Sequence, residues 1–255
     1  MIPPEGRGGM PATITIVQAR MGSHRLPGKS MMPVWRDMTL LELVLRRITR
    51  AKIPAMTILA TSTDPRDDVL VPVAGACGVT VFRGSEADVL GRYAAALARY
   101  PADAVVRAAA DNPLLDPERI DDLIRFFWTA RPACDYASNL GPVTGHPDGV
   151  GVEMVSAETL RRLDREARDP SHREHVVTYL HGNPKYRSCL LEARPEFRRP
   201  HYRLDIDFPE DLHFVRELVK RLPDAHAPYW TTAEIIAVLD REPELLKLRK
   251  DRSKL

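Results

Sequence analysis

The chain has 255 residues, of which 44% are hydrophobic and 28% charged, the balance of an ordinary globular protein with one large domain or two small ones. Its 37 basic and 35 acidic residues give a net charge of +2, which excludes a general affinity for nucleic acid. No apolar run is long enough to span a membrane, and the three widely spaced cysteines form neither a disulfide framework nor a metal motif, so we expect a cytoplasmic protein.

The first segment predicts no regular structure. Residues 1–12 combine glycine and proline with charged residues and contain no apolar stretch, so we expect a disordered lead-in rather than a signal peptide. Met1 and Met10 both fit as the natural start of the chain. An apolar, β-branched run at residues 14–17 then predicts the first buried strand.

A loop rich in glycine and positive charge follows this strand. Gly22 and Gly28 allow the backbone to turn and to come close to a ligand. Backbone N–H groups in such a turn bind anions, and Arg20, Arg25 and Lys29 add full positive charges. The loop therefore predicts a cradle for a polyphosphate, with a solvated basic turn as the alternative. Its spacing is neither that of a P-loop nor that of a dinucleotide-binding motif.

Strands and helices alternate through the first half of the chain. Further strands are predicted at residues 56–61, 79–82 and 104–107, and helices at residues 39–51, 64–77 and 117–130, with one more helix ending at residue 99. This order predicts an α/β fold with a mostly parallel central sheet flanked by helices. In such a sheet ligands bind beyond the carboxyl ends of the strands, where the cradle lies.

Asp111 follows the fourth predicted strand and should lie at the same edge of the sheet as the cradle. A carboxylate placed opposite phosphates is costly unless a cation lies between them. A magnesium ion that bridges the carboxylate and the phosphates meets this need, so a metal ligand is predicted. The alternative role, a carboxylate at the start of a helix, suits Asp116 better because Pro117 follows it.

The second half of the chain alternates less regularly. Strands are predicted at residues 150–155, 186–192 and 201–206, and helices at residues 157–167 and 232–239. Two further helices are predicted, one that begins at residue 171 and one that ends at residue 222. Asp205 and Asp207 lie on one face at the end of the last predicted strand, where two like charges require a nearby cation. Asp211 suits the first turn of the next helix. Residues 246–255 are predicted to be a charged tail, solvated from Arg249 onward.

Several stretches together resemble a known family. Residues 18–29 are similar to the signature Ala-Arg-x-Gly-Ser-x-Arg-Leu-Pro-x-Lys of the cytidylyltransferases that activate acidic sugars with CTP, above all in the branch of spore-coat polysaccharide biosynthesis. Similar stretches follow in the family's order at residues 83–93, 107–117, 135–139, 173–175 and 207–212. The resemblance implies one nucleotide-diphosphosugar-transferase-like (Rossmann-like) catalytic domain over residues 13–245. It also implies Mg²⁺ as cofactor, CTP and a small anionic acceptor as substrates, and a homodimer.

The resemblance further assigns roles to individual residues. The catalytic residues would be Arg20, Lys29, Asp111 and Asp207. The metal would be held by Asp111 and Asp207, with Asp205 as a second candidate. The nucleotide would be bound by Gln18, Ala19, Arg20, Gly22, Ser23, Arg25, Lys29, Thr61, Arg83, Ser85, Arg107 and Asp111. The acceptor would be bound by Asn139, Glu153, Arg173 and His175.

Two positions depart from the family's pattern, and the second of them bears on the acceptor. Ala110 stands where a glycine usually precedes the aspartate, and Asp148 stands where an arginine is frequent. Because the second change removes a cation from the acceptor region, the acceptor need not be the family's usual one. An acidic sugar is the first expectation, and a small phosphonate or phosphorylated acid is the alternative. A non-catalytic nucleotide-binding module is a third interpretation, disfavoured by the presence of Lys29, Asp111 and Asp207.

Overall fold

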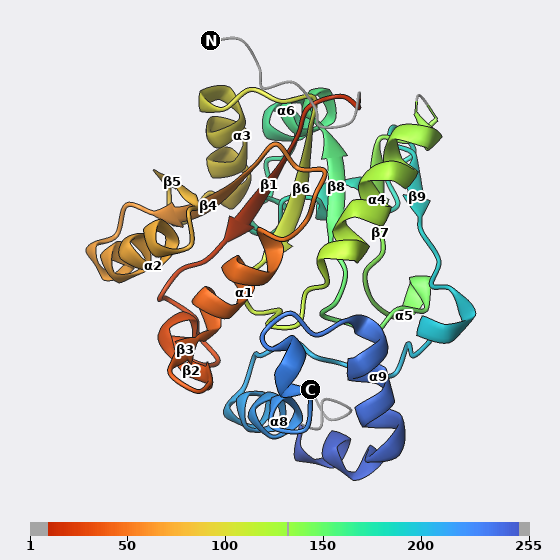
Figure 1. Cartoon of the computed structure of the whole chain (residues 1–255). Helices are drawn as coiled ribbons and strands as arrows, with labels where there is room; N and C mark the ends of the chain where they lie inside the picture. Colours follow the sequence, from red (N-terminus) through yellow and green to blue (C-terminus); the bar gives the residue numbers. More distant parts are fainter. Residues whose placement is uncertain (1–9, 132, 250–255) are drawn as a thin grey trace.

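The computed structural model describes residues 10–131 and 133–249. Its central element is a seven-stranded sheet with the strand order β5-β4-β1-β6-β8-β7-β9 (Figure 1). The strands are β1 (Thr13–Gln18), β4 (Met56–Ser62), β5 (Thr80–Gly84), β6 (Ala104–Ala109), β7 (Tyr136–Ser138), β8 (Glu153–Ser156) and β9 (Ser188–Leu190). β1 runs parallel to β4 and β6, whereas β8 is antiparallel to both of its neighbours. The predicted α/β fold with a mostly parallel sheet is confirmed.

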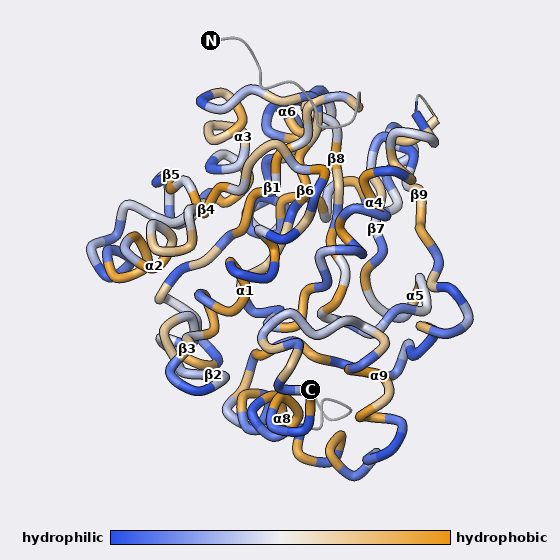
Figure 2. The backbone as a smooth tube through the Cα atoms, viewed as in Figure 1, coloured by the Kyte–Doolittle hydropathy of each residue, from blue (hydrophilic) through white to orange (hydrophobic). Residues whose placement is uncertain are grey.

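Helices cover both faces of the sheet, and each face has its own hydrophobic core. The first core is built with α1 (Leu40–Ile48), α2 (Leu70–Ala76), α4 (Pro117–Ala130), α8 (Pro209–Val219) and α9 (Thr232–Arg241). The second core is built with α3 (Val89–Arg99) and α6 (Ala157–Glu166). Alternate residues of β1 serve the two cores, since Ile14 and Ile16 belong to the second and Val17 to the first. Figure 2 shows the central strands as largely hydrophobic and the outer helices as mixed.

Shorter elements lie outside this sheet. They are the hairpin of β2 (Pro33–Trp35) and β3 (Met38–Thr39), the short helices α5 (Gly141–Thr144) and α7 (Pro170–His175), and the 3₁₀ turns Lys29–Met31, Pro65–Val69, Thr178–Leu180, Pro195–Phe197, Asp224–His226 and Pro243–Leu248. The helix predicted at residues 64–77 is therefore a 3₁₀ turn followed by α2. The strand predicted at residues 186–192 is reduced to β9.

The strand predicted at residues 201–206 is wrong. Its apolar residues Tyr202, Leu204 and Ile206 alternate along the segment and are buried, which explains the strand-like pattern, but the segment forms one isolated bridge instead of a ladder. Its backbone partners are residues of loops: Asp148 donates to the carbonyl oxygen of Tyr202, and Ile206 donates to that of Asp111, each at 2.8 Å. The segment thus crosses the ends of the strands and ties them to the C-terminal part of the chain, which Figure 1 shows below the sheet.

Both ends of the described chain pack against the domain. Ala12 is 4% exposed, and its N–H donates to a carboxylate oxygen of Asp103 at 2.7 Å, so the ordered structure reaches into the expected lead-in. The Arg249 side chain is 8% exposed and makes ion pairs, so the expectation of a solvated run is wrong at this residue. Residues 1–9 and 250–255, for which we predicted a disordered lead-in and a solvated tail, lie outside the described residues. None of the described helices has the length and apolar character that crossing a membrane requires.

Candidate active site

A cavity of about 560 Å³ opens at the carboxyl ends of β1 and β6. This is the switch point of the sheet, because β4 and β5 extend from β1 in one direction while β6 and its neighbours extend in the other. We call the residues that the two strands contribute, Gln18, Arg107 and Ala109, the floor of the cavity. The loop after β1, which we call the cradle loop (residues 19–30), and parts of α3 and α7 form its walls.

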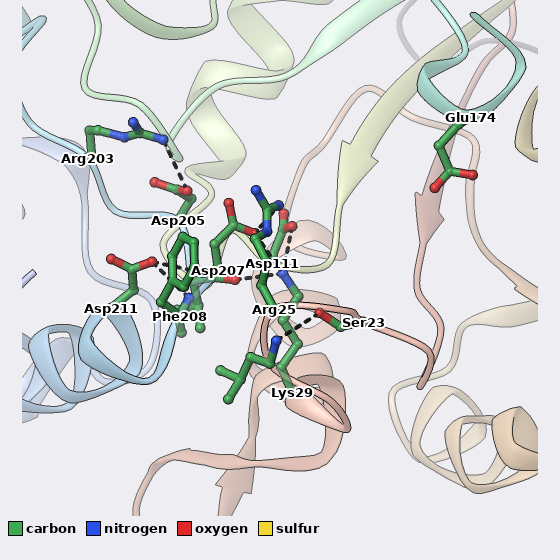
Figure 3. Close-up of polar contacts among 12 residues, drawn as sticks. Ser23, Arg25, Lys29, Asp111, Glu174, Arg203, Asp205, Asp207, Phe208 and Asp211 are labelled. Atoms are coloured by element: carbon green, nitrogen blue, oxygen red, sulfur yellow. Dashed lines mark hydrogen bonds and ion pairs between the residues drawn. The ribbon is translucent and has the colours of Figure 1, made fainter. Parts of the chain in front are cut away.

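At one end of the cavity Lys29 joins two carboxylates from distant parts of the chain (Figure 3). Its Nζ lies 3.0 Å from Asp111 Oδ2 and 3.2 Å from Asp207 Oδ1, and it donates to the carbonyl oxygen of Ile206 at 2.6 Å. The preceding Gly28 has a φ of 73°, which glycine adopts without strain and which turns the cradle loop at this point. The structure thus brings together three of the four residues predicted to be catalytic.

The two arginines of the cradle loop hold different partners. Arg25 Nη2 lies 2.7 Å from Asp207 Oδ1, at the Lys29 end of the cavity. Arg20, the fourth predicted catalytic residue, places its Nη2 2.9 Å from Glu174 Oε1 of α7. Figure 3 shows Glu174 well apart from the cluster around Lys29. The cradle loop therefore presents cations to two separate regions of the cavity.

A buried carboxylate that the sequence analysis missed supports the cradle loop. Asp67, in the 3₁₀ turn after β4, is 2% exposed, and its Oδ1 accepts from the N–H of Met21 at 2.7 Å. Its Oδ2 accepts from the hydroxyls of Thr61 and Ser62 at 3.0 and 2.6 Å. Burial raises the pKa of Asp67, but these hydrogen bonds outweigh burial and leave the pKa below its usual value. Thr61, predicted to bind the nucleotide, contacts Asp67 and is itself fully buried.

Two more residues predicted to bind the nucleotide lie beside this turn and not among the residues that line the cavity. Arg83 donates to the carbonyl oxygens of Ser62 and Asp64 at 2.8 Å each. The hydroxyl of Ser85 accepts from the N–H of Asp88 at 3.1 Å, just before α3 begins. In this arrangement both side chains stabilise the loops after β4 and β5.

Two of the predicted acceptor residues are likewise engaged within the protein. Asn139 is fully buried, and both ends of its amide make hydrogen bonds to backbone groups, at 2.9 and 2.7 Å. Arg173 Nη2 lies 2.7 Å from carboxylate oxygens of both Asp88 and Asp164, so it ties α7 to α3 and α6. The structure does not bring these two side chains to the cavity.

Helix α7 does bring a third predicted acceptor residue, His175, to the cavity wall, next to Glu174. The helix ends in a γ-turn, in which the N–H of Val177 donates to the carbonyl oxygen of His175 at 2.7 Å. Val176, at the centre of the turn, has φ 62° and ψ −59°, a strained conformation for a β-branched residue. Because Val176 is fully buried in the second core, packing holds this turn and the two side chains before it in place.

Glu153, the fourth predicted acceptor residue, reaches the cavity through Arg107. The two side chains form an ion pair between β8 and the floor, and Glu153 Oε1 accepts from the hydroxyl of Tyr136 at 2.6 Å. Burial, and after it the nearby Glu153 carboxylate, raises the pKa of Tyr136 well above its usual value. Arg92 of α3 also lines the cavity, and the sequence analysis assigned it no role.

Asp205 and Asp207 have different surroundings, although they are two residues apart. Asp205 lies 3.4 Å from Arg203 Nη2 and 3.1 Å from Arg249 Nη2, and Figure 3 shows the first of these pairs. The fully buried Asp211 also pairs with Arg249, at 2.9 Å, and its Oδ2 accepts from the N–H of Asp207 at 3.0 Å. Of the candidate metal ligands, Asp207 thus faces Lys29 and Asp205 faces arginines.

The carboxylates at the Lys29 end fit one kind of metal site. Among the described residues, no group of three or more His, Cys, Asp or Glu side chains is placed to hold a metal ion. Asp111 and Asp207 do, however, share one cation, the ammonium group of Lys29. A site for Mg²⁺ commonly takes only one or two carboxylates from the protein and completes its shell with waters and substrate phosphates. The two carboxylates are sufficient for such an ion and insufficient for a metal held by the protein alone.

Comparisons with known proteins identify the family and the fold. The sequence profile of the cytidylyltransferase family matches residues 14–235. The spore coat polysaccharide biosynthesis protein SpsF of Bacillus subtilis (strain 168) is 34% identical over 90% of this chain and 94% of its own length. The structure of a cytidylyltransferase from Leptospira borgpetersenii is similar with a TM-score of 0.85 and 29% identity, over 94% of this chain and 98% of that one. CMP:2-keto-3-deoxy-manno-octonic acid synthetase, solved in complex with CTP, shares the fold with a TM-score of 0.61 at 16% identity, over 82% of this chain and 98% of that one.

Proposed function

The chain belongs to the cytidylyltransferase family of nucleotidyltransferases, and we propose that it transfers CMP from CTP to a small anionic acceptor and releases pyrophosphate. The observation that carries the proposal is the cluster of Lys29, Asp111 and Asp207 at the end of β1 and β6. These residues come from three distant segments, and they combine carboxylates for a metal with a cation for phosphates at one edge of the sheet.

In the proposed reaction an acceptor oxygen attacks the α-phosphorus of CTP, and the bond to the bridging oxygen breaks so that pyrophosphate leaves. Arg20, Arg25 and Lys29 bind the β- and γ-phosphates and neutralise the charge that develops on the leaving group. Asp111 and Asp207 would hold Mg²⁺, which neutralises phosphate charge and orients the reacting groups when it is bound. For Lys29 this requires its ammonium to move from the two carboxylates toward the phosphates.

The acceptor is proposed to be an acidic sugar, and a small phosphonate or phosphorylated acid is the alternative. His175 on the cavity wall and Arg107 on the floor, with Glu153 behind it, supply hydrogen-bonding groups for it. A relative that is 29% identical over 43% of this chain carries the name 3-deoxy-manno-octulosonate cytidylyltransferase, which supports the sugar acid as the first choice.

The test is pyrophosphate release by the full chain with each of the four nucleoside triphosphates, Mg²⁺ and a panel of acidic sugars, phosphonates and phosphorylated acids. We expect release with CTP and with one class of acceptor. Binding of CTP without release for any acceptor would favour the non-catalytic nucleotide-binding module. No binding of any triphosphate would contradict the proposal as a whole.

The metal assignment has its own test in Asp111→Asn. This variant keeps the size and one oxygen of the side chain but removes the charge, so we expect a large loss of pyrophosphate release that is partly recovered at high Mg²⁺. Asp224→Asn, at a surface residue with a side chain 86% exposed, is the matched control and should behave like the wild type. Unchanged release by Asp111→Asn would overturn the metal role.

The proposal also includes the domain limits and the assembly. Residues 13–245 are proposed to be one catalytic domain, and the chain is proposed to act as a homodimer, as the family resemblance implies. Light scattering coupled to size-exclusion chromatography measures the mass directly. A mass near 28.7 kDa would contradict the dimer.

A further inference from the structure

The floor of the cavity contains polar groups for which the protein supplies no partner. Within the described residues, Gln18 Oε1, Arg92 Nε and Arg107 Nε are buried and make no hydrogen bond. All three residues line the same cavity. A buried polar atom without a partner costs free energy, and several of them at one wall of a cavity indicate that a ligand supplies the missing partners.

Arg92 is the clearest case. It is 2% exposed, and its guanidinium donates from Nη1 to the carbonyl oxygen of Ser85 at 2.6 Å. No carboxylate among the described residues forms an ion pair with it, so its charge is buried without a close counter-ion. Burial lowers the pKa of Arg92, the direction expected for such a cation. Within the described structure Nε has no partner, and Nε belongs to the edge through which a guanidinium grips an oxyanion with two parallel hydrogen bonds.

Arg107 lines the same cavity and is also only partly hydrogen-bonded within the described structure. Its Nη1 pairs with Glu153, while its Nε is without a partner in the described structure. Tyr93, whose hydroxyl donates to the carbonyl oxygen of Ile16 on β1 at 3.2 Å, is within electrostatic range of both Arg92 and Arg107. Two guanidinium groups therefore share this region, and Glu153 offsets the charge of one of them.

We propose that Gln18, Arg92 and Arg107 form a subsite for the acceptor, which binds its oxyanion with the two guanidinium groups and a neighbouring hydroxyl with the amide of Gln18. The subsite rests on the proposed function, which requires an acceptor in this cavity. It departs from the sequence expectation that gave Arg107 and Gln18 to the nucleotide. It also takes the place of Asn139 and Arg173 as the predicted acceptor residues, because the side chains of these two bind other groups of the protein.

The charges around this subsite favour the acceptor over the nucleotide as its ligand. The triphosphate has its own cations in the cradle loop and its own metal carboxylates at the Lys29 end. The cytosine base is neutral and would leave the charge of Arg92 buried and unbalanced. An acceptor with an oxyanion balances that charge, and a hydroxyl beside the oxyanion donates to Gln18 Oε1. A hydroxy acid meets both requirements.

The experiment measures binding of small probes to the full chain without divalent metal and with saturating CTP, so that the cradle loop is occupied. The probes are D-glycerate, which joins a carboxylate to hydroxyls, glycerol 3-phosphate, which joins a phosphate to hydroxyls, and neutral glycerol. Ligand-detected NMR titration gives each dissociation constant. We expect D-glycerate or glycerol 3-phosphate to bind and glycerol not to bind, and the better of the two identifies the oxyanion.

Variants then locate the bound probe. Arg92→Met and Arg107→Met should each weaken oxyanion binding about tenfold or more, because each removes a charge-assisted pair of hydrogen bonds. The affinity for CTP should stay within about twofold, as expected when the lost contacts are not made to the nucleotide. Arg162→Met, on α6, is the matched control and should bind both ligands as the wild type does. If Arg92→Met does not fold, Arg92→Lys keeps the charge, removes the fork and should show a smaller loss.

Other results would contradict the subsite in distinguishable ways. If the wild type binds CTP but neither oxyanion probe, the subsite is wrong and the proposed function stands. If the arginine variants lose CTP as strongly as the oxyanion, the floor belongs to the nucleotide. If the wild type binds an oxyanion that Arg92 and Arg107 variants bind equally well, the anion lies elsewhere. Absence of CTP binding in the wild type, with Mg²⁺ as well as without it, would refute the proposed function itself.

Discussion

Lys29 uses all the donors of its ammonium group inside the protein. Its Nζ contacts two carboxylates and one carbonyl oxygen, and the side chain is 13% exposed. A lysine has three donors and acts as a point charge, so the ammonium holds Asp111 and Asp207 near each other without fixing the orientation of either. Lys29 neutralises the two carboxylates in this structure, and under the proposed function it would neutralise the phosphates of bound CTP instead.

Lys29→Met keeps the length of the aliphatic chain and removes the charge. We expect pyrophosphate release at saturating CTP and Mg²⁺ to fall about 100-fold, the order seen when one preorganised stabilising group is removed from an active site. Lys185→Met is the matched control, because Lys185 is a surface residue with a side chain 64% exposed, and its rate should be unchanged. A Lys29→Met rate within about twofold of the wild type would show that Lys29 is only structural.

Asp67 couples the cradle loop to the acidity of the solution. Its pKa is lowered in the folded state, so its ionised form stabilises the fold at pH values above its usual pKa of 3.8, and that contribution is lost as the pH falls through the lowered value. Asp67→Asn cannot accept all of the hydrogen bonds from Met21, Thr61 and Ser62. At pH 7 we expect it to reduce the free energy of unfolding by about 1–3 kcal/mol.

The sign of the pH dependence provides the check. Since the asparagine side chain of the variant does not titrate, the difference in stability between wild type and Asp67→Asn should shrink as the pH falls below 3.8, and denaturant unfolding at several pH values measures it. Asp68→Asn, next to Asp67 in the same turn and with a side chain 61% exposed, controls for the turn itself. A difference that is constant down to about pH 2 would mean that the carboxylate charge of Asp67 contributes nothing.

Helix α8 and the last 3₁₀ turn form a structural unit around Arg249. The guanidinium of Arg249 pairs with Asp205 and with the fully buried Asp211, and lies 5.3 Å from the ring centre of Phe214 in α8. Asp211 in turn accepts from the N–H groups of Asp207 and Phe208, so it caps α8 and fixes the backbone of Asp207. The C-terminal segment thus supports a residue of the Lys29 cluster through one buried carboxylate.

Arg249→Met should lower the free energy of unfolding by about 3 kcal/mol, because it removes an ion pair from the buried carboxylate of Asp211. Lys247→Met, two residues earlier and with a side chain 75% exposed, should change it little. In the double variant Arg249→Met/Asp211→Asn both charges of this ion pair are removed, so the combined loss should be smaller than the sum of the two single losses. Additive losses in denaturant unfolding would show that the two side chains do not interact.

At the scale of the whole molecule, the sequence predicted the features that follow from the order of strands and helices along the chain. Apolar β-branched runs separated by amphipathic helices define the parallel part of the sheet, and the carboxyl ends of those strands must meet at one edge. For this reason the sequence could place Lys29 and Asp111 together before any coordinates. Asp207 was placed with them by its motif, although the strand assumed to precede it does not exist.

What the sequence did not reveal depends on contacts between distant segments. Asp67 and Arg249 look like surface charges because charged residues surround them in the sequence, yet the side chain of each is buried in contact with a segment far along the chain. The alternation in residues 201–206 arises from packing of an extended loop on the first core, and the same pattern would result from a strand. Patterns of hydrophobicity report burial, and they do not report which backbone supplies the hydrogen bonds.

The cavity joins elements from the whole chain, so a ligand that fills it should stabilise the molecule as a unit. Under the proposed function, CTP held by the cradle loop and the Lys29 end of the cavity would bind the folded state alone, and at a free concentration about one hundred times its dissociation constant it would add about 2.7 kcal/mol to the free energy of unfolding. For a domain of this size that corresponds to a rise in melting temperature of roughly 5–10 °C. We expect this rise in the presence of Mg²⁺ with CTP and a smaller one with ATP, GTP or UTP at the same concentration. Equal rises for all four would mean that the cavity binds the triphosphate without reading the base, and no rise for any of them would remove the basis for placing a nucleotide here.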